Sequence, residues 1–337
     1  MEGGPKILII RFSSIGDIVL TTPIVRCLKQ QIPNAEIHYL TKDSNAIILN
    51  NNPNIDRVII FKGSFIEVLK QLRKEKYSYV IDSHRKLRSI AFVLRLLRPS
   101  KSIKKQSFKK WLLVNFKINI LPKKHIVDLH FDTVQSLGVK NDGKGLDYFL
   151  REEDYISPDA LPLSFQDGYV AVVIGSKHNT KQMPESVLIR ICNGIQSPII
   201  LLGDRDDRAK AIRVENEVGA RVFNGCGAYN LNQTAALIKN ANGIITPDTG
   251  LMHIAAAFDK NIISVWGNTV PEFGMYPYMS EDSKAEVYIF EEKNLKCRPC
   301  SRIGFEKCPK KHFKCMNSFD EEKIISIANN WPHYILD

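Results

Sequence analysis

Residues 6–17 read KILIIRFSSIGD. The first five residues form a short apolar run rich in branched side chains, which is typical of a buried strand in a parallel sheet. The Ser and Gly residues after this run turn the chain, and apolar residues then recur at helical spacing from Ile18 to Gln31. Three more strand-like runs alternate with helical segments, at 36–40, 58–61 and 79–82. This alternation predicts right-handed crossovers and a parallel α/β sheet.

A second α/β series follows a polar, linker-like stretch around residues 151–159. Its strand-like runs lie at 169–175, 198–203, 221–223, 243–246 and 261–267. A chain of 337 residues suits two domains of roughly 150 residues each. We therefore predict two Rossmann-like domains, 1–155 and 156–337, whose parallel sheets present their carboxyl ends to a central cleft. A last helix over about 319–335 could cap either domain, including by packing back on the first.

Positive charge is concentrated in the first half of the chain. The net charge is +11, and residues 51–150 carry 21 Lys and Arg against 8 Asp and Glu. Such a field attracts nucleic acid, anionic lipid or an acidic sugar substrate, although a solvated basic surface is the simpler alternative. No apolar run reaches the roughly 18 residues of a membrane span, and the N-terminus lacks the features of a signal peptide. We therefore expect a cytoplasmic protein.

The turn after the first strand places Gly16 and Asp17 at a carboxyl strand end. Gly16 allows a ligand to approach the backbone closely. Asp17 fits two roles: an acid in the first turn of a helix, or a general base that takes the proton of an acceptor hydroxyl. The turn lacks the three glycines of a dinucleotide fingerprint, which disfavours a dinucleotide oxidoreductase.

A second strand-to-helix turn reads TPDTGLMHIAAA over residues 246–257. The backbone N–H groups at the start of its helix are suited to bind phosphate. Asp248 could instead be a plain helix cap, and His253 fits a packed histidine as well as a ligand contact. The loop over 175–184 contains Lys181, which could neutralise a diphosphate leaving group or be solvated. The acidic loop over 201–207 could accept hydrogen bonds from a ribose or be solvated.

Taken in order, these turns and the WGNT stretch at 266–269 closely resemble the ADP-heptose:lipopolysaccharide heptosyltransferases of glycosyltransferase family 9. The resemblance runs from about Lys6 to about Met316, and the DTGxxHxA segment at 248–255 is its most specific part. It implies a GT-B fold, inversion at the anomeric carbon, no cofactor and no required metal. It also implies transfer of heptose from ADP-heptose to the acidic, lipid-linked inner core of lipopolysaccharide. The protein could then be peripheral on the anionic inner face of the cytoplasmic membrane.

The resemblance further implies roles for matching residues. Asp17 would be the catalytic base. The acceptor side would be formed by Ser13, Ser14, Gly16, Arg85, Lys86 and Arg88. The donor would be held by Ser176, Lys181, Asp206, Asp248, Thr249, Gly250, Leu251 and His253. The chain departs from the family's pattern on the donor side, where Met183 replaces an aromatic residue and Asp204 replaces a glycine.

Four of the seven cysteines lie close together near the C-terminus, as Cys297, Cys300, Cys308 and Cys315. Their spacing is compatible with one tetrahedral zinc ion. Redox-sensitive pairs and packed free thiols are the alternatives, and a reducing cytoplasm disfavours disulfides. In none of these interpretations is the cluster catalytic.

Two other functions fit parts of the sequence. Transfer of another nucleotide sugar to a surface glycan would keep the fold and the mechanism. A nucleic-acid-binding protein would account for the basic half. However, that half lacks the interleaved aromatic residues of a stacking platform, and the predicted phosphate site lies in the acidic half. We therefore expect no nucleic-acid partner.

Overall fold

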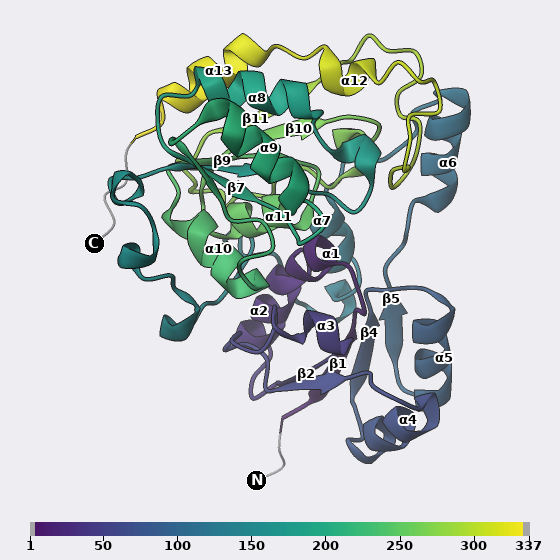
Figure 1. Ribbon diagram of the computed structural model, residues 1–337. Coiled ribbons are helices and arrows are strands. Elements are labelled where there is room, and N and C mark those ends of the chain that lie inside the picture. Colours follow the sequence, from purple (N-terminus) through teal and green to yellow (C-terminus); the bar gives the residue numbers. More distant parts are fainter. Residues whose placement is uncertain (1–3, 333–337) are drawn as a thin grey trace. The chain divides into compact units, whose positions relative to one another are not determined.

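The computed structural model describes residues 4–332, which divide into two compact units (Figure 1). Among these residues, unit 1 comprises 4–105, 124–149 and 278–282, and unit 2 comprises 106–123, 150–277 and 283–332. Each unit contains one parallel sheet, which confirms the predicted α/β class with two Rossmann-like halves. The central cleft stays a prediction. No helix among the described residues is both long and apolar enough to cross a membrane.

The sheet of unit 1 is built around β1 (Lys6–Ile10), in which every residue after Lys6 is buried. The strand order is β3-β2-β1-β4-β5, and all neighbouring strands are parallel. The other strands are β2 (Glu36–Thr41), β3 (Arg57–Ile60), β4 (Tyr79–Asp82) and β5 (Ser100–Ser102). The chain order reverses beside β1, where Ile10 pairs with Asp82. The carboxyl ends of β1 and β4 therefore form the switch point at which α/β sheets bind ligands.

Helices connect the strands of unit 1. They are α1 (Ile15–Val19), α2 (Thr22–Gln31), α3 (Asp43–Ala46), α4 (Phe65–Lys74), α5 (Leu87–Leu96) and α7 (Ile126–Phe131). In α4, the Ser64 hydroxyl accepts a hydrogen bond from the Ile66 N–H at 3.2 Å and so caps the helix. Val68, Leu69 and Leu72 recur at helical spacing and pack into the core of the unit.

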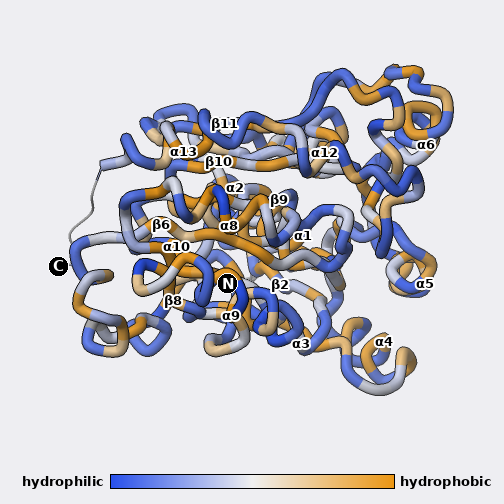
Figure 2. Tube along the Cα trace, turned by 45° about the horizontal axis from the view of Figure 1, so that its top comes forward, coloured by the Kyte–Doolittle hydropathy of each residue, from blue (hydrophilic) through white to orange (hydrophobic). Residues whose placement is uncertain are grey.

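The sheet of unit 2 has the order β11-β10-β9-β6-β7-β8 and is also parallel. Its strands are β6 (Val170–Val173), β7 (Ile199–Leu202), β8 (Val222–Asn224), β9 (Gly243–Pro247), β10 (Asn261–Trp266) and β11 (Val287–Glu291). Every residue of β6, β7, β9 and β10 is buried. Figure 2 shows apolar residues along the strands at the centre of this sheet. Strands buried on both faces are expected to be apolar throughout rather than alternating.

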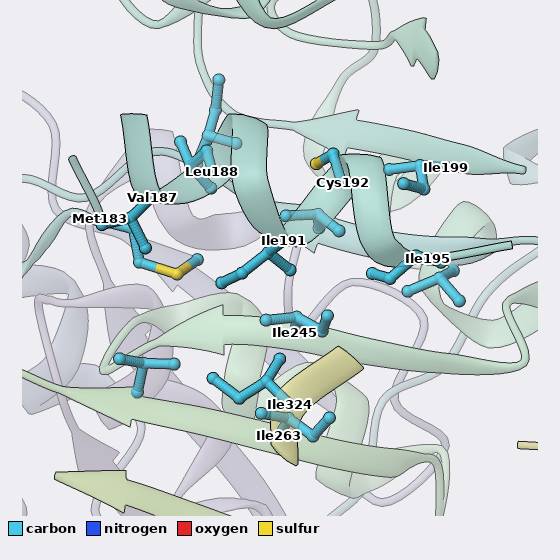
Figure 3. Packing of buried hydrophobic residues seen from close by; sticks show 14 of the residues in the cluster. Met183, Val187, Leu188, Ile191, Cys192, Ile195, Ile199, Ile245, Ile263 and Ile324 are labelled. Carbon is cyan, nitrogen blue, oxygen red and sulfur yellow. The ribbon is translucent and has the colours of Figure 1, made fainter. Parts of the chain in front are cut away.

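Helices of unit 2 pack around its sheet, except for the helix over residues 107–116, which packs on Val270 and Phe273 beyond the sheet. They are α6 (Ser107–Phe116), α8 (Glu185–Gly194), α9 (Arg208–Val218), α10 (Leu231–Asn240), α11 (Gly250–Ala257), α12 (Lys314–Asn317) and α13 (Glu321–Asn329). Figure 3 shows how Val187 and Ile191 of α8 meet Ile245 and Ile263 of the sheet, with Ile324 of α13 nearby. These side chains are fully buried. Truncating such a side chain typically costs about 2–5 kcal/mol, so this cluster stabilises the unit strongly.

Three segments lie in a different unit from the predicted domain: residues 106–123 and 150–155, predicted in the first domain, and residues 278–282, predicted in the second. Residues 106–123, predicted in the first domain, belong to unit 2, where Leu113 is buried with Val270 and Phe273. Residues 278–282, predicted in the second domain, belong to unit 1, where the Glu281 N–H donates to the Gly143 carbonyl at 2.8 Å. An amphipathic pattern shows that a helix buries one face, but it does not show against which sheet.

The last helix packs within unit 2. The Arg190 guanidinium of α8 makes two hydrogen bonds of 2.7 Å to Glu321, and the Asn329 side-chain amide donates to the Gly194 carbonyl at 3.0 Å. A Cβ atom on Gly194 would lie 2.5 Å from Ile325, so the two helices approach closely at a glycine. Packing of this helix against the first domain stays a prediction. Positions 333–335 of the predicted helix lie outside the described residues.

Candidate functional site

In unit 1, Asp17 lies in the first turn of α1, directly beyond the carboxyl end of β1. Its carboxylate accepts hydrogen bonds from the Ser14 N–H at 3.0 Å and from the Ser14 hydroxyl at 2.9 Å. Its other oxygen lies 2.5 Å from the guanidinium of Arg11, a residue that is 6% exposed. Arg11 also donates to the Ser13 carbonyl at 2.8 Å and to the Ser83 carbonyl. Asp17 therefore does occupy a first-turn, capping position, and it is also the partner of a buried arginine.

The surroundings of Asp17 keep it ionised. Burial acts to raise the pKa of Asp17, but the Arg11 guanidinium and the hydrogen bonds from Ser14 outweigh burial and hold that pKa well below its usual value. An ionised carboxylate can accept a hydrogen bond from a hydroxyl group. Because its basicity is low, it can take the proton only as bond formation makes that hydroxyl acidic.

The charges of Arg11 and Asp17 act on three other basic side chains of unit 1. Burial, and after it the charge of Arg11, lowers the pKa of His84 to about 4 and the pKa of His130 to about 3, so both rings are neutral at pH 7. Burial likewise lowers the pKa of Lys105 to about 8, with repulsion from Arg11 opposed by attraction to Asp17. Among the described residues, the Nδ1 atoms of both histidines are buried without a hydrogen-bond partner. Such atoms are rare in folded proteins and often indicate where a ligand or water binds.

The three basic residues that were predicted to bind the acceptor substrate have different environments. Arg85 donates from its backbone N–H to Asp82 at 2.7 Å and from its guanidinium to the Ile103 carbonyl at 2.9 Å. The guanidinium of Arg88 lies over the Phe61 ring, 5.0 Å from its centre. The charge of Lys86 contributes to lowering the pKa values of His84 and Lys105. Of the three, Lys86 is therefore the one whose charge acts on the groups near Asp17.

In unit 2, Lys181 and Asp248 lie together beyond the carboxyl ends of β6 and β9. The Lys181 ammonium lies 2.5 Å from the Asp248 carboxylate and donates to the Asp248 carbonyl at 3.3 Å. The Thr269 hydroxyl, beyond β10, donates to the same carboxylate at 2.9 Å. Three strand-end loops thus converge on one ion pair whose side chains are 16% and 13% exposed.

The start of α11 adjoins this ion pair. Thr249 is the N-cap residue, and its side chain makes no capping hydrogen bond; its hydroxyl lies 3.2 Å from that of Thr246. The backbone N–H groups of Gly250 and Leu251 lie in the first turn, which is only half-buried. Such a helix start attracts phosphate. His253 is 2% exposed within α11, as expected of a packed histidine.

The acidic loop places Asp207 rather than Asp206 between the strand ends. Asp207 is buried and accepts from the Asp204 N–H at 3.0 Å, and a Cβ atom on Gly175 would lie 1.9 Å from its carboxylate. The Gln182 side-chain amide donates a hydrogen bond to the Ser176 carbonyl at 2.9 Å, so Ser176 lies beside Gln182 in the loop after β6. Asp206 is exposed, and its backbone N–H donates to Asp204 at 2.9 Å.

Asn268 is a candidate that the sequence analysis did not single out. It is 2% exposed, and neither its side-chain oxygen nor its side-chain nitrogen has a hydrogen-bond partner among the described residues. The backbone carbonyl of Asn268 accepts a hydrogen bond from the Cys300 N–H at 3.0 Å, which fixes the loop beside Thr269. An unsatisfied buried amide costs about 1–3 kcal/mol, so a ligand that paired with it would gain affinity.

The cysteine-bearing segment supports the donor loops. The buried Arg298 guanidinium donates to the carbonyls of Gly267 and Thr269, at 2.5 and 3.0 Å. Thr180, next to Lys181, exchanges hydrogen bonds with the backbone of Phe305 at 2.8 to 3.0 Å. The segment therefore holds both the Lys181 loop and the loop after β10 in place.

No three of the four clustered thiols lie within 4.8 Å of one another in the part of the chain that the structure describes. Among residues 4–332, the one group of three or more ligand atoms within 4.8 Å of one another is Glu36, His38 and Glu75, whose carboxylates are paired with Lys6. Burial raises the pKa of Cys300 to about 11 and that of Cys315 to about 12, which keeps both as thiols. The neighbouring thiols of the cluster contribute to both pKa shifts after burial, and Cys297, Cys300 and Cys308 are half-buried, so the role of the cluster stays a prediction.

Comparison with known proteins identifies one family for this chain. A family model described as glycosyltransferase family 9 (heptosyltransferase) matches residues 65–303. Lipopolysaccharide heptosyltransferase 1 of Campylobacter coli is 25% identical over 293 residues, which cover 78% of this chain and 84% of that protein. A family 9 glycosyltransferase of Veillonella parvula shares the fold with a TM-score of 0.77 and 22% identity, and the match covers 98% of both chains. The Escherichia coli heptosyltransferase WaaC, solved with ADP, matches with a TM-score of 0.64 and 23% identity over 84% of this chain and 93% of that one.

A more distant structure carries a metal. The heptosyltransferase TibC is described as dodecameric and iron-containing; it matches with a TM-score of 0.58 and 12% identity, over 98% of this chain and 77% of that chain. At this identity the match shows the fold alone, and binding of a metal by the present chain stays untested.

Proposed function

Because the chain belongs to glycosyltransferase family 9, the heptosyltransferase family, we propose that it transfers a heptose from ADP-heptose to an acidic, lipid-linked acceptor of the lipopolysaccharide inner core. Curated relatives named lipopolysaccharide heptosyltransferase 1 support the assignment. The observation that carries the donor side of the proposal is the convergence of Lys181, Asp248 and Thr269 at the start of α11.

The donor diphosphate would bind at this convergence. The first-turn N–H groups of α11 and the Lys181 ammonium would face its oxygens, and Asp248 would hold the ammonium in place. As the bond between the anomeric carbon and the diphosphate breaks, the electron pair leaves with ADP. A preorganised cation and helix start stabilise that charge without reorganisation. Asn268 and the buried carboxylate of Asp207 would contribute to recognition of the donor.

The acceptor hydroxyl would be activated by Asp17. Its oxygen attacks the anomeric carbon on the face opposite to the leaving diphosphate, so the configuration inverts. Its proton passes to the Asp17 carboxylate as the glycosidic bond forms. Arg11 orients Asp17 through their ion pair and keeps it in the ionised form that can accept this proton. No step in this mechanism uses a metal ion.

We expect a selective response of the protein to adenine nucleotides. ADP should raise the midpoint of thermal unfolding more than UDP, GDP or CMP, and EDTA should not change this shift. Lys181→Ala should remove most of the shift, because the diphosphate loses its cation; Lys177→Ala, an exposed lysine in the same loop, is the matched control. Stabilisation by UDP or GDP instead would exclude ADP-heptose as the donor.

We also expect the reaction to slow at alkaline pH. The pKa of Lys105 is lowered to about 8, so its positive charge is present below that pH and is lost above it. If this charge attracts the acidic acceptor, kcat/KM for the acceptor should decrease above about pH 8, and Lys105→Met should abolish that decrease. The pKa of Asp17 is too low to produce an acidic limb between pH 5 and 8. An unchanged alkaline limb in the variant would contradict this role of Lys105.

A further inference from the structure

Positive charge and exposed apolar side chains coincide in one part of the chain. Residues 83–127 contain 13 Lys and Arg residues and no Asp or Glu. The same stretch carries nine of the seventeen exposed large apolar side chains found in residues 4–332. On a purely solvated surface such side chains are scattered singly and charges of both signs are mixed. Residues 106–123 of this stretch belong to unit 2, so within unit 1 the coincidence is confined to the part around residues 83–105, where it indicates a surface with a binding partner.

In unit 1 this surface is α5. Leu87, Ile90, Leu94 and Leu97 follow one another at intervals of three or four residues, so they lie along one face of the helix. They are 89%, 37%, 65% and 84% exposed. The opposite face is buried, through Ser89, Phe92 and Leu96. The helix thus has apolar residues on its outer face as well as on its inner face, and Figure 2 shows apolar and polar positions interspersed along it.

Leu97 is unusual in its backbone as well as in its exposure. It ends α5 in the left-handed conformation, with φ of 51°. Glycine or asparagine is favoured at such a position, because a larger side chain strains the backbone. Since Leu97 is 84% exposed, packing within the unit does not explain it. A residue that breaks a local rule without a structural gain is often kept for function.

Uncompensated positive charges flank the apolar stripe. They belong to the exposed residues Lys86, Arg88, Arg95, Arg98 and Lys101. In the part of the chain that the structure describes, none of these five forms an ion pair with a carboxylate. A partner with negative charge at its surface would therefore meet no competing carboxylate here.

A small depression lies at the C-terminal end of α5. Its volume is about 240 Å³, and its lining includes Arg73, Arg95, Arg98, Tyr77 and Leu97. Three guanidinium groups next to an exposed leucine suit an anionic phosphate whose remaining part is apolar. A phospholipid headgroup combines these two properties.

We propose that α5 and Leu97 form the face by which unit 1 docks on an anionic phospholipid bilayer. Leu87, Leu94 and Leu97 enter the boundary between headgroups and acyl chains, and Arg95 and Arg98 bind headgroup phosphates. This deepens the proposed function, on which the choice of a membrane as partner partly rests, because a lipid-linked acceptor lies in such a surface. Nucleic acid would use the arginines but would leave the leucine stripe in water.

The experiment measures co-sedimentation of the full chain with vesicles, in the absence of donor and acceptor. Vesicles of phosphatidylcholine and phosphatidylglycerol in equal parts should bind the protein, and vesicles of phosphatidylcholine alone should bind it far less. Binding should weaken between about 0.05 and 0.5 M salt, because surface charges are then screened. The triple variant Leu87→Gln, Leu94→Gln, Leu97→Gln should bind the anionic vesicles about tenfold or more weakly, since its apolar anchors are gone.

A matched variant tests whether the position of the apolar residues matters. Leu163→Gln, Ile212→Gln, Ile303→Gln removes three exposed apolar side chains outside residues 83–127, and it should bind as the wild type does. Arg95→Gln, Arg98→Gln should lower binding to anionic vesicles with the leucine stripe intact. The ADP-induced thermal shift, measured in parallel, reports the fold and the donor site separately from vesicle binding. Equal binding by the wild type and the leucine triple variant, or binding to single-stranded RNA but not to vesicles, would overturn the proposal.

Discussion

Asp17→Asn should lower kcat by about 10²–10⁴-fold, the usual effect of removing a general base. The variant keeps the size of the side chain and an oxygen that can accept from the Ser14 N–H, which now donates at 3.0 Å. It cannot take the proton of the acceptor hydroxyl. KM for the donor should change little, because Lys181 and α11 are untouched. Steady-state kinetics of ADP release, normalised to folded protein, measures the effect.

The control for this variant is Asp43→Asn, which changes an acid in the first turn of another helix of unit 1. Asp43 is exposed, so its substitution should leave kcat within about twofold of the wild type. Asp17→Asn also removes the charge partner of the buried Arg11, so some loss of stability is expected and is measured by thermal unfolding. If kcat of the folded Asp17→Asn protein stayed within tenfold of the wild type, Asp17 would act as a capping residue only.

Arg298→Met should destabilise the protein by about 3–5 kcal/mol, the usual cost of breaking a buried ion pair by removing one partner. The Arg298 and Glu291 side chains are 4% and 7% exposed and lie 3.0 Å apart. The guanidinium also donates to the carbonyls of Trp266, Gly267, Thr269 and Glu292. Methionine has a similar length but no donor, so it would leave the carbonyls without the guanidinium and the carboxylate with only the exposed Lys293 ammonium, at 3.8 Å. Urea unfolding measures the change.

Arg302→Met is the matched control, because Arg302 belongs to the same segment but is exposed. Its effect on the free energy of unfolding should be within about 0.5 kcal/mol. Arg298→Met should also weaken ADP binding, since Arg298 holds the loop that carries Asn268 and Thr269. A loss of less than about 1 kcal/mol would show that these contacts do not stabilise the segment.

The strands that the sequence predicted are those with continuous apolar runs. β1, β6 and β10 are buried along their length, and burial on both faces of a parallel strand produces such runs. Two edge strands were missed. β5 has the sequence SKS and pairs with β4 through its backbone, so its side chains give no signal. β11, VYIFE, has one buried residue and lies at the edge of its sheet.

The candidate site residues that the sequence singled out most clearly follow predicted strands. Asp17, Lys181 and Asp248 lie in such loops, and the structure gives each a specific charged partner. Arg11 could have been noted, because a basic residue at the end of an apolar strand is unusual. His84 and His130 could not, because only the folded chain brings residues so far apart in sequence under the influence of one charge. For the cysteines, the spacing is compatible with a tetrahedral metal site, and no three of the thiols lie within 4.8 Å of one another in the described residues.

The most direct test of the proposed function is transfer itself. The purified protein would be incubated with ADP-heptose, or with a UDP-hexose, and a lipid-linked inner-core acceptor that lacks heptose, with and without EDTA. The product would be analysed by mass spectrometry, and its anomeric configuration by NMR. We expect the acceptor to gain one heptose from ADP-heptose only, with inversion and equally in EDTA. Transfer from the UDP-hexose, or retention of configuration, would contradict the proposed donor or mechanism, and no transfer by protein that binds ADP would contradict the proposed acceptor.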